Sequence, residues 1–201
     1  MTTRNYAQDS KALLRNSLLD GLHDLLMDRD WSAIRMSDVA AATGVSRQTV
    51  YNEFGSRYGL AQGYAVRLAS RFAGHVADSL AEHVDDVTGA LRTAFTEYFT
   101  GVATDPPLIA SLLSGEAKPD LMKLITTDAA PIIATAGDRL SQAFRESTWL
   151  SMPDSDIERI ARAITRMALS YVAMPPEGDR DVAADLAEII APAIETARLS
   201  D

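Results

Sequence analysis

The stretch that decides the fold is MSDVAAATGVSRQTVYNEF, residues 36–54, which predicts two short helices joined by a tight turn. Ser37 is suited to cap the first helix, because its hydroxyl can accept a hydrogen bond from a backbone N–H of the first turn. Gly44 stands where that helix must end, in a left-handed conformation that glycine adopts without steric cost. Ser46 is suited to cap the second helix in the same way. The stretch therefore predicts a helix-turn-helix.

The second helix, residues 47–54, separates an inner face from an outer face. Val50 and Phe54 lie four residues apart and face inward, so the remaining side chains point mostly elsewhere. In helix-turn-helix proteins the second helix enters the major groove of DNA. We predict that Arg47 makes the first base contact, because it opens the helix and a guanidinium group can contact guanine through two hydrogen bonds.

Other residues of this region are predicted to support that contact. Gln48 and Thr49 are the next predicted base contacts, and Ser37, Tyr51 and Arg57 are predicted to position phosphates. Glu53 has three open interpretations: it repels phosphate, it accepts a hydrogen bond from a cytosine amine, or it is simply solvated, which we expect. The full predicted DNA-binding set is Ser37, Ser46, Arg47, Gln48, Thr49, Tyr51, Asn52 and Arg57.

The motif TVYNEFGSRYGL, residues 49–60, carries a family resemblance. It follows VSRQ and is preceded by an amphipathic helix of about 25 residues. Together these features resemble the DNA-binding domain of the tetracycline-repressor (TetR) family of bacterial regulators, in a pattern that here falls on Thr49, Val50, Tyr51, Phe54 and Leu60. The family often has an aromatic residue, a His and a Lys at the backbone-contacting positions that Asn52, Glu53 and Gly55 occupy here.

The resemblance implies an all-α fold of about nine helices in two domains. The expected domains are a helix-turn-helix head, residues 1–56, and a helical body for effector binding and dimerisation, residues 57–201. The spacing of apolar residues predicts a helix from Ser10 to about Met27 and one long helix over 57–83 that belongs to both domains. Further helices are predicted over 85–102, 108–113, 120–150 with a break at Pro131, 155–174 and 179–199.

Charge is divided unequally along the chain. The net charge is −9, but residues 1–75 carry nine Lys or Arg against seven Asp or Glu, and residues 76–201 carry ten against twenty-one. A DNA-binding head on an acidic body gives this asymmetry. Because the head's excess is small, its positive surface must come from local placement. We expect that surface to be made by Arg4, Lys11, Arg15, Arg35, Arg47 and Arg57.

Aromatic and Met residues of the body are predicted to line an effector cavity. Any one of them could equally be an ordinary core residue, but the resemblance implies a pocket between the body helices. Few charges interrupt the inner faces, so the expected effector is small and hydrophobic, with an acyl or hydrocarbon chain. The predicted lining residues are Phe72, Phe95, Tyr98, Phe99, Met122, Phe144, Met167 and Tyr171.

The last two long helices carry apolar residues on more than one face. A helix that is apolar around much of its circumference must bury more than one side. The resemblance implies a four-helix interface with a second copy, although a monomer could use the same residues in its core. The predicted homodimer interface is Ile157, Ile164, Val182, Leu186, Ile190 and Ile194.

Several other classes of protein are not expected. The sequence has no GxSxG, no phosphate-binding glycine loop and no HExxH, so we predict no enzyme. It has no cysteine, and His75 and His83 would diverge by about 80° on one helix, so neither a metal nor another cofactor is predicted. No stretch is long and apolar enough for a membrane span or a signal peptide, so no membrane partner and a cytoplasmic location are expected.

We therefore interpret the sequence as a homodimeric regulator that binds a double-stranded DNA operator and is a repressor released by a small apolar effector. One alternative is a helical enzyme or ligand carrier that has kept a degenerate DNA-binding head. Another is a regulator that responds to a protein partner.

Overall fold

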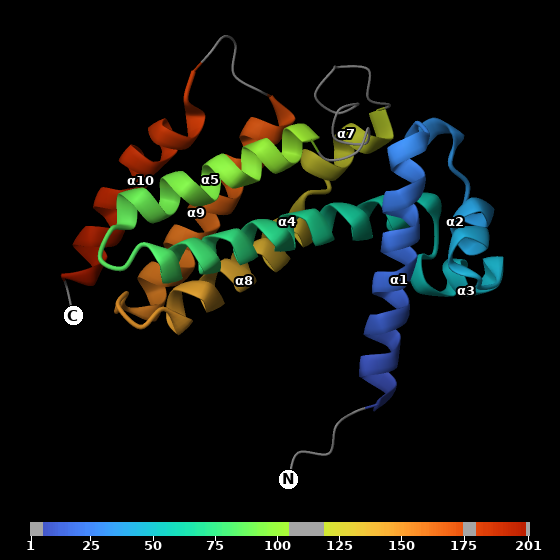
Figure 1. Cartoon of the computed structure of the whole chain (residues 1–201), viewed down its shortest axis with the longest axis horizontal. Helices are drawn as coiled ribbons and strands as arrows, with labels where there is room; N and C mark the ends of the chain where they lie inside the picture. The colour runs from blue at the N-terminus through green and yellow to red at the C-terminus, as the bar shows by residue number, and fades with distance from the viewer. Residues whose placement is uncertain (1–5, 105–118, 175–179, 200–201) are drawn as a thin grey trace.

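A computed structural model of the chain describes residues 6–104, 119–174 and 180–199 (Figure 1). Those residues form nine α-helices and one 3-10 turn, and none of those helices has the length and apolar composition needed to cross a membrane. The elements in order are α1 (Tyr6–Asp28), η1 (Trp31–Ala33), α2 (Met36–Thr43), α3 (Arg47–Phe54), α4 (Arg57–Glu82), α5 (Val87–Thr104), α7 (Pro119–Ile125), α8 (Ala130–Glu146), α9 (Asp154–Ala173) and α10 (Val182–Arg198). The predicted all-α fold is confirmed.

The head is built around the apolar stripe of α1. Leu18, Leu22 and Leu26 are fully buried, because residues three to four apart share one face of a helix. Their cluster includes the inner residues of α2 and α3 and also Trp31. The helix begins at Tyr6, four residues before the predicted start. In Figure 1, α1 crosses α4 steeply, and α2 and α3 lie on its outer side.

The long helix α4 joins the head to the body, as predicted. Its N-terminal residues Leu60, Ala61 and Tyr64 lie in the head cluster, whereas Phe72 and Val76 lie in the body cluster. Figure 1 shows α4 running without interruption from α3 across the body. A displacement of one end of such a helix can be transmitted to the other end.

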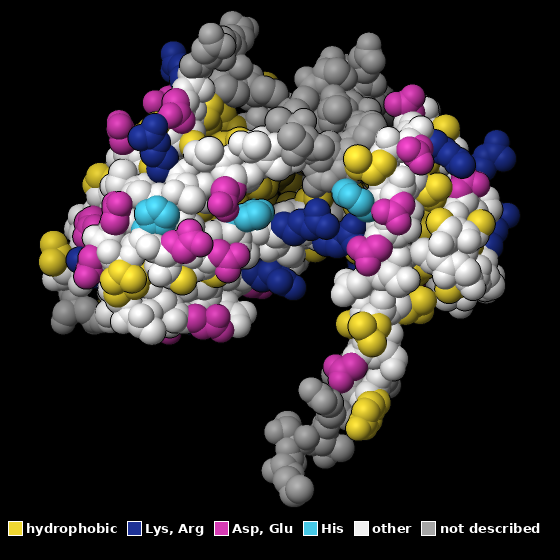
Figure 2. Space-filling model, viewed as in Figure 1, with side chains coloured by type: hydrophobic (Ala, Val, Ile, Leu, Met, Phe, Trp, Pro, Cys, Tyr) yellow, Lys and Arg dark blue, Asp and Glu magenta, His cyan; other side chains and the backbone are white. Residues whose placement is uncertain are grey.

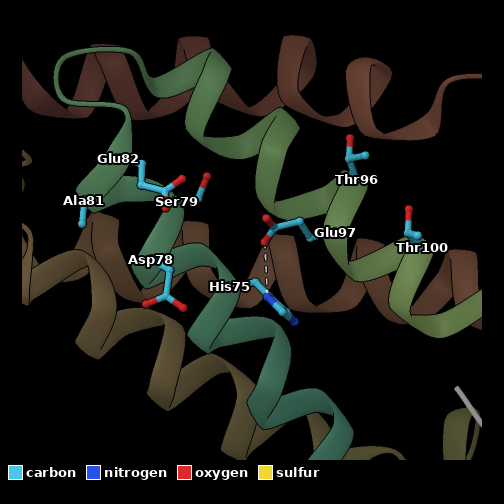
Figure 3. A pocket seen from close by; sticks show the side chains of 8 residues that line it. All are labelled: His75, Asp78, Ser79, Ala81, Glu82, Thr96, Glu97 and Thr100. Carbon is cyan, nitrogen blue, oxygen red and sulfur yellow. Dashed lines mark ion pairs between the residues drawn. The ribbon is translucent and has the colours of Figure 1, made fainter. Parts of the chain in front are cut away.

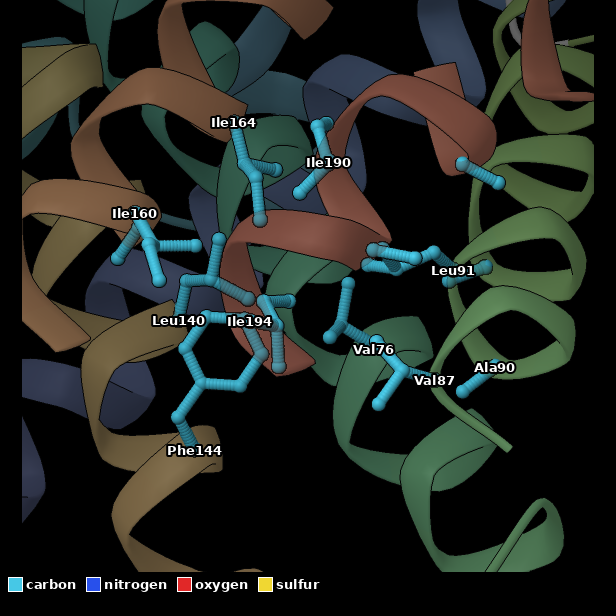
Figure 4. Close-up of a cluster of buried hydrophobic side chains, with 14 of the residues drawn as sticks. Val76, Val87, Ala90, Leu91, Leu140, Phe144, Ile160, Ile164, Ile190 and Ile194 are labelled. Carbon is cyan, nitrogen blue, oxygen red and sulfur yellow. The ribbon is translucent and has the colours of Figure 1, made fainter. Parts of the chain in front are cut away.

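The body is a bundle of α4, α5, α8, α9 and α10 around one apolar core (Figure 4). Leu140 and Phe144 of α8, Ile164 of α9 and Ile194 of α10 are fully buried there. Helix α10 packs chiefly on α5, and α8 packs on both α4 and α9. This arrangement closes the bundle within one chain.

Two differences from the predicted helices concern prolines and the middle of the chain. The region predicted as one interrupted helix over 120–150 is two helices, and Pro131 lies in the first turn of α8. Proline fits there because a first-turn N–H has no helical partner to lose. The short helix predicted over 108–113 lies outside the described residues.

Candidate nucleic-acid interface and effector site

The turn between α2 and α3 has the conformation that its glycine requires. Gly44 has φ 70° and ψ 22°, in the left-handed region, where a side chain would be strained. Helix α2 begins at Met36, two residues before the start that a Ser37 cap would give, and the Asp38 carboxylate accepts a hydrogen bond of 2.8 Å from the backbone N–H of Arg35. Ser37 is therefore not the cap that the sequence predicted. It lies exposed in the first turn.

Helix α3 is fixed at both ends by local contacts. The Ser46 hydroxyl accepts a hydrogen bond of 3.1 Å from the backbone N–H of Thr49, which confirms the predicted cap. Gly55, with φ 71°, ends the helix and donates from its N–H to the Tyr51 carbonyl at 2.7 Å. Val50 and Phe54 are buried as predicted. Both caps and both inner residues thus hold the opposite face of α3 toward solvent.

That outer face carries polar side chains at adjacent positions. Arg47, Gln48 and Asn52 are exposed, and Thr49 and Tyr51 are half-buried. The Gln48 side-chain amide donates to the Asn52 side-chain oxygen Oδ1 at 2.8 Å, and Arg47 donates to the Tyr51 hydroxyl at 3.3 Å. These hydrogen bonds join exposed side chains that lie one helical turn apart. The same donors and acceptors can form hydrogen bonds to base edges or phosphates instead.

Arg57 does not lie with the other seven predicted DNA-binding residues. It is half-buried, its guanidinium stacks 4.2 Å from the centre of the Trp31 ring, and it donates a hydrogen bond to the Trp31 carbonyl. Burial also lowers the pKa of Arg57 from its usual value. In this structure the side chain supports the joint between η1 and α4, so a phosphate contact would require it to leave Trp31.

Glu53 forms an ion pair that the sequence did not indicate. Its carboxylate lies 2.7 Å from the Arg15 guanidinium of α1, and its side chain is only 7% exposed. Arg15 also lies 4.6 Å above the Phe54 ring. The expectation that Glu53 is solvated was wrong, because a residue 38 positions away supplies the opposite charge. The pair fixes α3 against α1 and keeps this carboxylate from the outer face.

The predicted positive surface is consequently smaller than expected. Arg15 is paired with Glu53, Arg57 is stacked on Trp31, and Arg4 lies outside the described residues. The exposed members of the predicted set are Lys11, Arg35 and Arg47. Local placement therefore concentrates the available positive charge near α1, the start of α2 and the start of α3.

In the body, five of the eight predicted effector residues contact one another. Phe72 lies 5.6 Å from Phe95 and 4.6 Å from Tyr98, and Phe99 lies 5.3 Å from Tyr98 and 6.1 Å from Tyr171, between ring centres. Burial raises the pKa of Tyr98, so its hydroxyl stays protonated. We call these five residues, from α4, α5 and α9, the aromatic cluster.

The other three predicted effector residues have different surroundings. Met167 is half-buried against the body core. Phe144 is fully buried and is drawn beside Leu140 and Ile194 in Figure 4, so it is a core residue of the bundle. Met122 of α7 packs against the head cluster instead. Phe144 shares the body core with Phe72 and Phe95, but among the described residues no ring pair joins it to the aromatic cluster. Sequence spacing alone could not separate Phe144 and Met122 from the cluster.

A polar groove of approximately 710 Å³ lies on the surface between α4 and α5 (Figure 3). His75 and Glu97 face each other across it at 3.3 Å, and Asp78 and Glu82 lie on the α4 side. Among the described residues, no three His, Asp or Glu side chains are arranged to hold a metal ion. The groove is too polar for the predicted hydrophobic effector.

All six predicted dimer-interface residues are buried within one chain. Their exposed fractions range from 0% for Ile164 and Ile194 to 8% for Val182. They were mispredicted because the monomer's own α5 and α8 cover these faces, which the apolar pattern could not reveal. The apolar residues left exposed on and beside α10 are Ile189, at 67%, and Leu199, at 82%, with Ala193 and Pro192 between them.

Comparison with known proteins assigns both parts of the chain to one family. The pattern described as bacterial regulatory proteins of the tetR family matches residues 18–63, and the pattern described as a bacterial tetracyclin repressor C-terminal domain matches residues 86–192. The chain is 57% identical over 190 residues to the HTH-type transcriptional regulator AlkX of Mycobacterium tuberculosis, covering 94% of this chain and 89% of that protein.

Solved structures agree. The TetR family repressor AlkX from Dietzia sp. strain DQ12-45-1b, described as implicated in biodegradation of n-alkanes, superposes with a TM-score of 0.84 and 41% identity. That match covers 92% of this chain and 96% of the Dietzia chain. FadR of Thermus thermophilus, solved with lauroyl-CoA, shares the fold with a TM-score of 0.56 and 21% identity, covering 90% and 93%. The chain belongs to the TetR family of bacterial transcriptional regulators.

Proposed function

We propose that this protein is a homodimeric repressor that acts in the cytoplasm, binds its operator through α3 and releases it when an apolar effector enters the body. The observation that carries the proposal is the likeness to two AlkX regulators over almost the whole chain, one of them described as a repressor. The outer face of α3 supports the DNA-binding role, because Arg47, Gln48 and Asn52 are exposed and free of the apolar core. We place the boundary between the DNA-binding domain, 1–56, and the effector-binding domain, 57–201, at the start of α4.

The aromatic cluster supports an effector with a hydrocarbon chain. Five rings from three helices meet there, and they include the hydroxyl of Tyr98, whose pKa is raised by burial. An alkyl chain placed among such rings gains about 25 cal/mol for each Å² of apolar surface removed from water. The Dietzia relative's link to n-alkanes supports the same class of effector, namely an alkane or an acyl derivative of one.

The second subunit is proposed to pack on the outer faces of α9 and α10. Ile189 and Leu199 are large apolar side chains that one chain leaves exposed. Symmetric pairing of α10 with a second copy would bury them, as isologous interfaces do. Two recognition helices could then contact two successive turns of the major groove.

The experiment is a titration of alkyl compounds of increasing chain length against the protein bound to DNA from its own genomic neighbourhood, after footprinting has located the operator. We expect release to strengthen with chain length until the cavity is full and to respond little to salt, because apolar burial dominates the affinity. An equal response at every length, or release only by small charged molecules, would remove the apolar effector and leave operator binding intact.

The alternatives give different results in the same preparation. An enzyme or ligand carrier with a degenerate head would bind alkyl compounds in a thermal-shift assay but show no footprint. A regulator that responds to a protein partner would give a footprint but no ligand-dependent rise in melting temperature.

A further inference from the structure

A cleft lined by four arginines lies where the head meets the body. It has a volume of approximately 480 Å³ and is bounded by α1, α4 and α8. Arg15 comes from α1, Arg67 and Arg71 from α4, and Arg139 from α8, and none of the ten lining residues is an Asp or Glu. In Figure 2, Lys and Arg side chains gather where α1 meets the body, in a molecule whose body is otherwise acidic.

Contacts to neighbouring residues fix the guanidinium groups of Arg67 and Arg15. Arg67 lies 2.5 Å from the Asp20 carboxylate, donates to the Leu19 carbonyl at 2.8 Å and stacks 5.1 Å from the Tyr64 ring centre. Its Nε is buried and has no hydrogen-bond partner among the described residues. Arg15 is fixed by Glu53. Pre-positioned guanidinium groups lose little side-chain entropy when an anion binds.

We propose that this cleft binds the phosphate group of a small phosphorylated ligand, as a second ligand site distinct from the effector cavity. Even with Arg15 paired to Glu53 and Arg67 paired to Asp20, four guanidinium groups from three helices carry more N–H donors than one ligand carboxylate can accept. A phosphate or diphosphate has enough oxygens and charge to use several of them. The remaining lining residues suit the uncharged part of such a ligand. They are Asn16, Leu19, Gly63, Val66, Ser70 and Thr135.

The cleft is separate from both other sites of the molecule. Ser70 lines the cleft and Phe72 belongs to the aromatic cluster. Residues two positions apart on a helix point about 160° apart around its axis, so these two side chains lie on nearly opposite sides of α4. Helix α4 therefore stands between the cleft and the proposed effector. None of the lining residues is among the eight predicted DNA contacts, and two of them come from α8 of the body. This placement favours a small ligand over the operator backbone as the source of the phosphate.

Occupation of the cleft would also act on DNA binding. A phosphate held by Arg15 and Arg139 at once would tie α1 of the head to α8 of the body, across the joint that α4 spans. The spacing of the two recognition helices depends on that joint. The ligand would therefore change operator affinity to the extent that it binds one position of the head relative to the body more tightly than another. This consequence rests on the proposed repressor function, whereas phosphate binding itself does not.

The test is calorimetric titration of inorganic pyrophosphate into the DNA-free protein at constant ionic strength, with Arg139→Gln as the variant and Arg180→Gln as the control. Both arginines are exposed, both substitutions remove one positive charge, and Arg180 lies two residues before α10, outside the cleft. We expect Arg139→Gln to weaken pyrophosphate binding about tenfold, because charge-assisted hydrogen bonds are lost. Arg180→Gln should bind like the wild type.

Three outcomes would overturn the proposal. If both substitutions weakened pyrophosphate binding equally, the affinity would depend only on the overall charge of the protein. Absence of binding to the wild-type protein would remove the site. If the DNA-free protein does not bind pyrophosphate but Arg139→Gln weakens operator binding in a mobility-shift assay, the phosphate belongs to the DNA backbone. Loss of operator binding by every form, with pyrophosphate binding retained, would instead contradict the proposed function and leave the cleft standing.

Discussion

Arg47 occupies the first position of α3, where its side chain is exposed and its guanidinium donates to the Tyr51 hydroxyl of the same helix. Arg47→Ala should lose roughly 1–3 kcal/mol of specific operator affinity and relax the preference at one base position in each half-site. Mobility shifts on a set of operator variants measure both effects. The melting temperature should stay near that of the wild type, and unchanged binding to every variant would show that Arg47 does not contact a base.

Glu53 and Arg15 differ in exposure, and this difference predicts unequal effects of removing them. The Glu53 side chain is 7% exposed and that of Arg15 is 41% exposed. Arg15→Met leaves a nearly buried carboxylate without its partner and should destabilise the fold by roughly 1–3 kcal/mol. Glu53→Gln leaves a guanidinium that water can still reach, so its cost should be smaller. Urea unfolding of both single variants and the double variant measures the coupling, and the reverse order would contradict the role of burial.

At the scale of elements, neighbouring isoleucines of α10 distinguish the proposed interface from the core. Ile189 is 67% exposed and Ile190 is 5% exposed. Ile189→Arg should keep the fold but give monomers in sedimentation velocity, because the charge would face the second subunit. Ile190→Arg should fail to fold, since it places an unpaired charge in the bundle. A folded, dimeric Ile189→Arg protein would place the interface elsewhere.

At the scale of the whole molecule, the body touches the head beyond α4. Leu121, Leu124 and Ile125 of α7 lie in the head cluster, and the Tyr58 hydroxyl donates to the Asp128 carboxylate. This bond joins the first turn of α4 to the segment between α7 and α8. A change in the body can therefore reach the head both along α4 and through α7 and the Tyr58–Asp128 bond.

The second route gives a prediction about coupling. Tyr58→Phe removes the bond to Asp128 and leaves the ring in place, so operator affinity without effector should change little. The ratio of operator affinities with and without effector should move toward one, because coupling requires a contact that differs between the two states. Fluorescence anisotropy with labelled operator, at zero and saturating effector, measures this ratio. The same ratio in variant and wild type would show that the Tyr58–Asp128 bond does not carry the coupling.

Local patterns predicted much of the head and its recognition helix. The stripe of Leu18, Leu22 and Leu26, the left-handed Gly44 and the Ser46 cap each depend on residues within a few positions. Such features can be predicted because helical periodicity, caps and left-handed conformations are short-range properties. The outward face of α3 followed from the same reasoning.

Contacts between distant residues were not predictable in the same way. Arg15 and Glu53 are 38 positions apart, and no spacing rule connects them. The aromatic residues are equally apolar in sequence, yet Phe99 lies in the aromatic cluster and Phe144 in the central core.

The sequence by itself determined an all-helical chain, a helix-turn-helix near its start and a long helix leading from it, because short-range backbone and side-chain preferences specify each of these. Only the tertiary structure decided which apolar faces the chain covers itself. An apolar stripe indicates that a face is buried but not which surface covers it. The sequence therefore predicted that Ile190 and Ile194 lie in a dimer interface, whereas in the structure they lie in the core of one chain. The cleft of four arginines likewise exists only because three helices bring Arg15, Arg67, Arg71 and Arg139 together.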